Sequence, residues 1–177
     1  MRFASTILVL ALAAATGAAG EPGAGAPAPA TGKAAVTIQV LSAQPGDGST
    51  GDGVDPRLAA KLRVSLEQMG MRKPDITSMA KPRTTQVGPG DTAAASQGGS
   101  GLEATCKAVD ADGVALSIVL FSDVKEGKKT ARKYSDPTTV RFSKPGQVQP
   151  FVQGDGKTVR VYVVSASREG GEAGQSK

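Results

Sequence analysis

Apolar and polar residues alternate along several segments of this chain, and this pattern constrains the fold more than any other feature. In the segment 36–43, the apolar residues Val36, Ile38 and Val40 are separated by polar ones. Successive side chains of a strand point to opposite faces, so this alternation predicts a strand with one buried face. The same pattern recurs in the segments 102–108, 114–120 and 158–165. The sequence therefore predicts a fold built mainly of half-buried strands.

Turn-forming residues between these segments predict antiparallel hairpins. The turn Asp110-Ala111-Asp112-Gly113 follows a segment whose apolar positions are Leu102, Ala104, Cys106 and Ala108. Gly and Asp favour chain reversal, so we expect a hairpin here with those four residues on its buried face. Weaker patterns predict further strands at 75–79, 131–135, 138–143 and 147–152, and further turns at 125–130 and Asp155-Gly156.

One segment, at about 56–69, carries the signals of an amphipathic helix. Asp55 is placed to cap its N-terminus, Pro56 fits the first helical position, and Gly70 fits the position just past its end. Its predicted apolar stripe consists of Leu58, Leu62, Leu66 and Met69. The predicted architecture is α+β, with this one helix packed on a mostly antiparallel β-sheet or small β-sandwich.

The first twenty residues, MRFASTILVLALAAATGAAG, have the pattern of a secretory signal peptide. Arg2 supplies a positive start, an apolar run follows, and small residues permit cleavage near Gly20. A membrane anchor needs about 18 or more apolar residues, and this stretch is too short. We therefore expect an extracytoplasmic protein, periplasmic or secreted, that does not span a membrane.

Three segments are poor in large apolar side chains and are expected to be disordered. They are the Pro/Ala/Gly linker 21–34, a loop at 84–101 and the tail 168–177. The loop at 84–101 contains a single Val among small and polar residues, so we expect it to be long and mobile. The sequence between the linker and the tail is predicted to form one β-rich domain over residues 35–167.

Composition excludes several kinds of chemistry. The chain has no His, one Cys and no Trp, and only 3% of its residues are aromatic. Without His it lacks imidazole-based catalytic dyads and triads and His-containing zinc sites. No catalytic constellation is visible, so we expect a protein that is not an enzyme and has no metal or other cofactor.

The single thiol, Cys106, has two interpretations. An unpaired Cys in an exported protein can form an intermolecular disulfide or serve as a reactive group. However, Cys106 shares the predicted apolar face of its strand, and a free Cys commonly packs as a small hydrophobe. We favour a core position.

Basic residues are concentrated in one part of the chain. Past residue 20 there are 20 Lys and Arg against 16 Asp and Glu, a net charge of +4. The segment 55–83 holds seven basic and three acidic residues and accounts for this excess. Candidate contacts for a polyanion are Arg57, Lys61, Arg63, Arg72 and Lys73. The alternative, which we favour, is the solvated face of one amphipathic helix plus its exit loop, with Arg57, Lys61 and Arg63 facing water. We expect no nucleic-acid partner for an exported chain.

The loop 45–55 contains Asp47, Asp52 and Asp55 among glycines. Carboxylates on a flexible loop can bind calcium, but the spacing differs from that of an EF-hand, and Asp55 also serves as the helix cap. A solvated loop is the alternative. The Gly-rich stretch continues as Val54-Asp55, without the Gly-Lys-Ser/Thr of a phosphate-binding loop.

The layout also resembles a group of proteins. A strand V-T-I-Q-V-L-S-A precedes G-V-D-P-R-L and a helix through L-E-Q-M-G, followed by I-T-S-M and a closing V-R-V-Y-V-V-S-A. This order resembles small uncharacterised exported proteins of myxobacteria and related high-GC bacteria, although Ile76 and Met79 replace the aromatic residues of their F-T-S-Y-like strand. The resemblance implies a fold layout and a compartment, with no activity and no site residues.

Two functions are compatible with these features. The first is a non-enzymatic exported module for protein–protein contact or assembly in the cell envelope, with an envelope protein as partner, because exposed sheet edges can pair with another chain. The alternative is binding of a polyanion or cell-surface polymer through the basic helix face.

Overall fold

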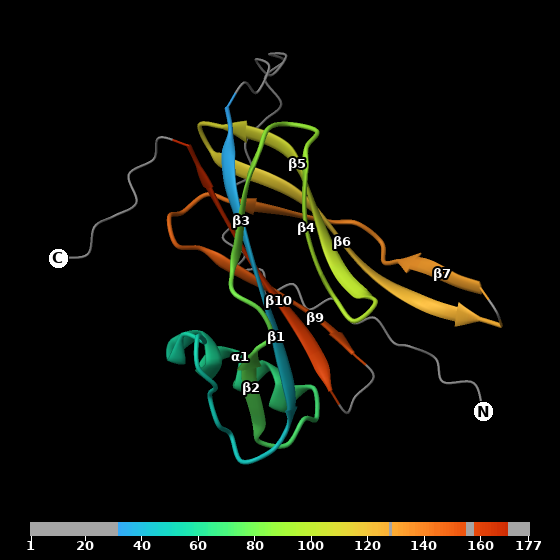
Figure 1. Ribbon diagram of the computed structural model, residues 1–177. Coiled ribbons are helices and arrows are strands. Elements are labelled where there is room, and N and C mark those ends of the chain that lie inside the picture. The colour runs from blue at the N-terminus through green and yellow to red at the C-terminus, as the bar shows by residue number, and fades with distance from the viewer. Residues whose placement is uncertain (1–31, 128, 155–157, 170–177) are drawn as a thin grey trace.

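The chain folds into three layers, with one helix packed outside two stacked β-sheets (Figure 1). This computed structural model describes residues 32–127, 129–154 and 158–169. The helix of this described part, α1, spans Pro56–Gln68. The strands are β1 (Ala34–Pro45), β2 (Pro74–Ser78), β3 (Arg83–Val87), β4 (Thr92–Gln97), β5 (Ser100–Asp110), β6 (Gly113–Glu126), β7 (Lys129–Tyr134), β8 (Thr138–Phe142), β9 (Val148–Gly154) and β10 (Val159–Arg168). The predicted α+β class is confirmed.

Each sheet contains one long strand that pairs with two shorter strands along the same edge. Sheet A has the order β2-β1-β10-β9, and β3 also pairs with β1. Sheet B has the order β4-β5-β6-β7, and β8 also pairs with β6. The strand β1 pairs with β3 through its first half and with β2 through its second half. All of these strand pairs are antiparallel, as the turn signals predicted.

Two apolar clusters hold the layers together. The inter-sheet core lies between sheets A and B and includes Val36, Ile38, Leu102, Leu116 and Tyr162. The helix core lies between α1 and sheet A and includes Leu41, Leu62, Leu66, Val161 and Val163. Because neighbouring residues of a strand face opposite sides, sheet A supplies apolar side chains to both clusters. This sheet is therefore the middle layer.

The ends of α1 match their sequence signals. The carboxylate of Asp55 accepts hydrogen bonds from the backbone N–H groups of Arg57 (2.7 Å) and Leu58 (3.3 Å). Pro56 occupies the first turn, and Gly70 has a φ of 92° just beyond the helix. The backbone N–H groups of Gly70 and Met71 bond the carbonyls of Glu67 and Leu66, which is the Schellman arrangement. Local chemistry accounts for both boundaries.

The segment 84–101 is not the mobile loop that its composition predicts. It contains most of β3 and all of β4, and it begins β5. The strand β3 pairs with Ala34–Ile38 of β1, and β4 pairs with β5. The side chains that it buries are small, chiefly Val87, Ala93 and Ala95. The backbone hydrogen bonds to neighbouring strands, which local hydrophobicity does not reveal, order this segment.

The predicted buried face of β5 is correct only as far as Cys106. The pairing of β5 with β6 shifts by one residue between Cys106 and Ala108, where a bulge accommodates Lys107. Beyond the bulge Val109 is buried and Ala108 is only partly buried. The expectation for Ala108 is therefore wrong, because one extra residue reverses the alternation of faces.

The boundaries of the predicted linker and tail also need correction. Ala34, at the end of the predicted linker, pairs with Arg168, at the start of the predicted tail. The backbone N–H of Glu169 donates to the carbonyl of Lys33 at 2.9 Å. The ordered sheet thus extends slightly beyond 35–167. The predicted signal peptide 1–20, residues 21–31 of the linker and the tail beyond Glu169 lie outside the described residues.

Candidate functional site

A hollow of about 320 Å³ lies on the outer face of sheet A, beside the first turns of α1. The helix covers only part of this face, and the hollow occupies sheet surface next to it. Its lining consists of Thr37, Gln39, Asp55, Arg57, Leu58, Lys61, Pro82, Gly146, Val148, Val163 and Ser165. The strands β1 and β10 supply the floor, and α1 supplies one wall. Its volume is at the lower end of the range for small-ligand sites, about 300–1,000 Å³.

The floor of the hollow mixes polar and apolar side chains, because Gln39 of β1 pairs with Val163 of β10 and Thr37 pairs with Ser165. Thr37 and Gln39 lie between residues that point into the inter-sheet core, so they face the hollow. Thr37 is paired with Ser165 across the β1–β10 ladder, and its hydroxyl is 2.8 Å from that of Thr84. The side-chain amide of Gln39 donates to the carbonyl of Gly53 at 2.8 Å. Hydroxyl and amide groups thus form a row at the base of the hollow.

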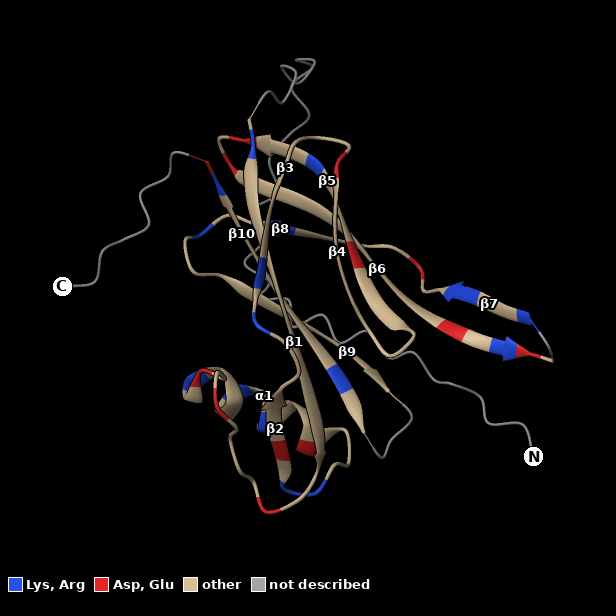
Figure 2. Cartoon of the chain, in the orientation of Figure 1, with Lys and Arg blue, Asp and Glu red and all other residues tan. Residues whose placement is uncertain are grey.

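Two basic side chains, Arg57 and Lys61, stand on the helical wall. They are four residues apart and therefore lie on the same face of α1, where both are exposed. Within the described part of the chain neither belongs to an ion pair. Figure 2 shows basic residues on α1 and, away from it, on β7. The first turn of α1 contains no acidic residue, and a cation there opposes the helix dipole, so Arg57 does not serve the stability of the helix.

The other predicted polyanion contacts lie outside this hollow. Arg63 is half-buried rather than facing water: its Nε donates to the carbonyl of Pro74 at 3.4 Å, and its guanidinium also bonds the hydroxyl of Thr50. Arg72 and Lys73 are exposed in the turn before β2 and do not line the hollow. The structure therefore brings Arg57 and Lys61 together on one wall of the hollow. Arg63 instead joins α1 to Pro74 and Thr50 by hydrogen bonds.

Cys106 is buried in the inter-sheet core, as predicted. Burial raises the pKa of the Cys106 thiol, which disfavours the reactive thiolate. Its Sγ lies 3.9 Å from the carbonyl oxygen of Ala108, within the same strand. This residue packs as a small hydrophobe.

The loop with the three predicted acidic ligands is closed by a fourth carboxylate, which sequence reasoning missed. Oδ1 of Asp75 accepts hydrogen bonds from the backbone N–H groups of Asp47, Gly48 and Ser49 at 3.1, 2.9 and 2.8 Å. These bonds, that from Ser49 foremost, lower the pKa of Asp75 to about 2. A Cβ on Gly46 would lie 1.8 Å from Oδ2 of Asp75, so any other residue there would displace this carboxylate.

Two of the three predicted acidic ligands also make hydrogen bonds within the protein. The carboxylate of Asp47 accepts a hydrogen bond from the N–H of Ser49 (3.1 Å), and that of Asp55 caps α1. Within residues 32–127, 129–154 and 158–169, no group of three or more His, Cys, Asp or Glu side chains is placed to hold a metal ion.

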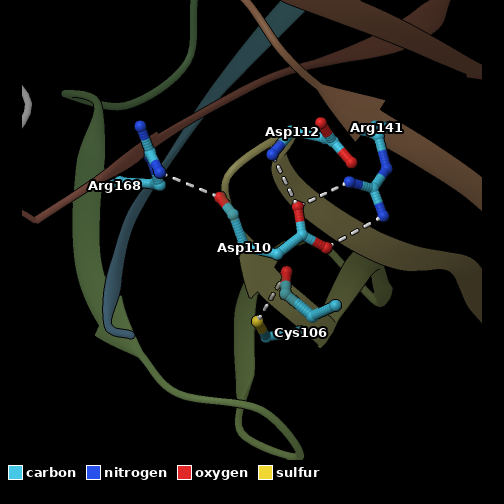
Figure 3. A network of polar contacts seen from close by, with 6 residues as sticks. Cys106, Asp110, Asp112, Arg141 and Arg168 are labelled. Carbon is cyan, nitrogen blue, oxygen red and sulfur yellow. Dashed lines mark hydrogen bonds and ion pairs between the residues drawn. The ribbon is translucent and has the colours of Figure 1, made fainter. Parts of the chain in front are cut away.

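A second acidic residue, Asp110, connects the ends of both sheets (Figure 3). Its carboxylate bonds the guanidinium of Arg141 from β8 at 2.7 and 3.2 Å, and its carbonyl accepts a bond from Arg168 of β10 at 3.0 Å. The bond to Arg141 lowers the pKa of Asp110. The sequence marked Asp110 only as a turn residue. Its partners are distant in sequence, so no local signal identifies them.

No protein-family model, curated protein or solved structure matches the chain. Among the described residues, no helix has the length and apolar character needed to cross a membrane.

Proposed function

We propose that the protein is an exported, non-enzymatic binding module that takes up an anionic group in the hollow beside α1. The observation that carries this proposal is the placement of Arg57 and Lys61 on one wall of a hollow whose floor also carries the hydroxyls of Thr37 and Ser165. It favours the polyanion alternative over a merely solvated helix face. The case against catalysis rests on the absence of His and of any catalytic constellation in the sequence.

The chemistry of the lining suits an anion. It carries two basic side chains and one acidic side chain, a net charge of +1, and Oδ1 of Asp55 already accepts hydrogen bonds from two backbone N–H groups of α1. The hydroxyls of Thr37 and Ser165 can donate hydrogen bonds to a bound oxygen. A phosphate or carboxylate group of a cell-surface polymer has the charge and size that this arrangement accepts.

Calorimetric titration with tripolyphosphate and with trigalacturonate tests the proposal. We expect binding by the protein to weaken with added salt, and Arg57→Glu combined with Lys61→Glu to weaken it about tenfold or more. An acidic residue near the N-terminus of α1 is favoured by the helix dipole, so these changes should not lower the melting temperature. The control is Arg72→Glu together with Lys73→Glu, which makes the same charge change outside the hollow. Binding that is insensitive to salt, or equally weakened by the control, contradicts the proposal.

Protein–protein contact in the cell envelope is the second candidate function. The observation that favours it is a two-stranded ribbon at the end of sheet B with open backbone edges. Export itself, to the periplasm or beyond, is part of both candidates and rests on the signal-peptide pattern of residues 1–20.

A further inference from the structure

The end of β6 and the strand β7 form a ribbon that extends past the rest of sheet B (Figure 1). We use the name ribbon for residues 123–126 and 129–134. The pairing of β5 with β6 ends at Ser100 and Ser122, and β8 pairs only with Val114–Ile118 of β6. Each strand of the ribbon therefore pairs with the other on one side, and on its second side no described strand pairs with it.

The register shows which backbone groups of β7 are unpaired. The N–H of Ser135 donates to the carbonyl of Leu120 at 2.8 Å, and the ladder continues from this pair towards the turn. Hydrogen-bonded pairs recur at every second residue of an antiparallel ladder, so the N–H and C=O groups of Thr130 and Arg132 point away from β6. This outer edge of β7 has the donors and acceptors that an added strand requires.

Polar and aromatic contacts hold the ribbon, because it has almost no buried apolar surface. Arg132 forms an ion pair with Asp123 at 2.8 Å, and its guanidinium lies 4.1 Å from the centre of the Phe121 ring. Lys133 forms an ion pair with Glu126 at 3.0 Å. These contacts engage both acidic residues of the ribbon.

The remaining charge of the ribbon is positive. Lys125 and Lys129 are exposed and form no ion pair with any residue that the structure describes. Figure 2 shows the basic residues along β7 and at the end of β6. Two copies of this edge would repel each other, whereas an acidic strand would complement it. At the other end of β7, Tyr134 is 53% exposed and offers an aromatic surface.

We propose that the outer edge of β7 binds an acidic, extended segment of a partner protein as an added strand. Acidic side chains at every second position of that segment would lie beside Lys129 and Lys133, which share one face of β7. Backbone hydrogen bonds would join it to Thr130 and Arg132. This inference rests on the second candidate function and is independent of the hollow beside α1.

The test uses a blocked, fluorescent eight-residue peptide of alternating Thr and Glu, with a Thr/Lys peptide for comparison. By fluorescence anisotropy we expect the Thr/Glu peptide to bind and the Thr/Lys peptide not to bind. Lys129→Glu with Lys133→Glu, the two positions that share one face of β7, should weaken binding about tenfold or more. The matched control, Lys107→Glu with Lys144→Glu, changes the same charge at exposed positions outside the ribbon and should leave binding unchanged.

A second variant separates strand addition from simple charge attraction. Thr130→Pro removes an outward N–H without changing charge, and proline is tolerated on an edge strand. We expect it to weaken binding about fivefold or more, while Thr130→Ala does not. In the unmodified protein, hydrogen exchange at the amides of Thr130 and Arg132 should slow when the peptide binds. This measurement does not depend on whether a variant folds.

Several outcomes overturn the inference. Normal binding by Thr130→Pro, with no change in exchange, would mean that the ribbon attracts anions without pairing. Binding to vesicles with 30% anionic lipid, without binding to the Thr/Glu peptide, would identify a membrane surface instead. Concentration-dependent dimers that Thr130→Pro abolishes would identify a second copy as the occupant.

The two proposals can fail separately. Because Arg57→Glu with Lys61→Glu changes only the hollow, its effect on anion binding tests the first proposed function and leaves the ribbon unchanged.

Discussion

The hydroxyl of Tyr162 in β10 donates a hydrogen bond of 3.3 Å to Oε1 of Gln153 in β9, and both side chains are buried. Nε2 of Gln153 in turn donates to the backbone carbonyl of Phe121 in β6 at 3.0 Å. This bridge joins sheet A to sheet B beside the apolar residues of the inter-sheet core. Because buried polar groups are costly when unpaired, it favours one alignment of the two sheets.

Gln153→Ala should destabilise the fold by about 3 kcal/mol, because it leaves the Tyr162 hydroxyl and the Phe121 carbonyl buried without their partner. Tyr162→Phe should cost about 1 kcal/mol, since it removes one hydrogen bond and little volume. Urea unfolding monitored by circular dichroism measures both. The control is Gln86→Ala in β3, where the side chain is exposed. Equal effects of Gln153→Ala and Gln86→Ala would show that the bridge has no energetic role.

The stability of the protein should fall in alkali because of Tyr162. Burial raises the pKa of its phenol from 10.0 to about 12. The phenol therefore loses its proton at a lower pH in the unfolded chain than in the folded protein. Its contribution to the free energy of unfolding is complete below pH 10, and up to about 3 kcal/mol of it is lost as pH rises towards 12. The difference in free energy of unfolding between the protein and Tyr162→Phe should change over this range. A difference that is constant from pH 8 to 12 would contradict the assignment.

The stability of the protein should also fall in acid, because of Asp75. Backbone hydrogen bonds, that from Ser49 foremost, lower its pKa from 3.8 to about 2. A carboxyl with a depressed pKa stabilises the fold above its unfolded value, and this stability is lost as pH falls from about 4 to about 2. Melting temperatures of the protein and of Asp75→Asn should therefore converge over this range. Asp52→Asn, at an exposed position of the same loop, is the control and should leave the acid profile unchanged.

Local sequence signals were sufficient where the structure depends on neighbouring residues. The cap at Asp55, the proline after it and Gly70 predicted the bounds of α1 to within one residue. The alternation in 114–120 predicted the buried face of β6, where Val114, Leu116, Ile118 and Leu120 are all buried. Both depend on fixed geometric periods of the backbone.

The strands β3 and β4 were missed because their order depends on distant partners. The residues Thr84 to Gln86 are exposed and carry no hydrophobic pattern, yet they pair with residues 35–37 of β1, far earlier in the chain. The error at Ala108 has a related origin, since a bulge depends on how two strands align.

The candidate site was only partly predictable for the same reason. The sequence placed Arg57, Lys61 and Arg63 together on one solvated helix face. The hollow that distinguishes Arg57 and Lys61 from Arg63 depends on where β1, β10 and the loop before β9 lie. Similarly, the carboxylate of Asp75 closes a loop more than twenty residues before it, which no spacing rule connects.

The sequence by itself determined the α+β class, the single predicted helix and the core position of Cys106, because these follow from the periodicity and composition of short segments. Tertiary structure decided which strand edges stay open and which basic side chains meet at a cavity. Those properties depend on contacts between residues far apart in the chain, so they exist only once the layers have packed.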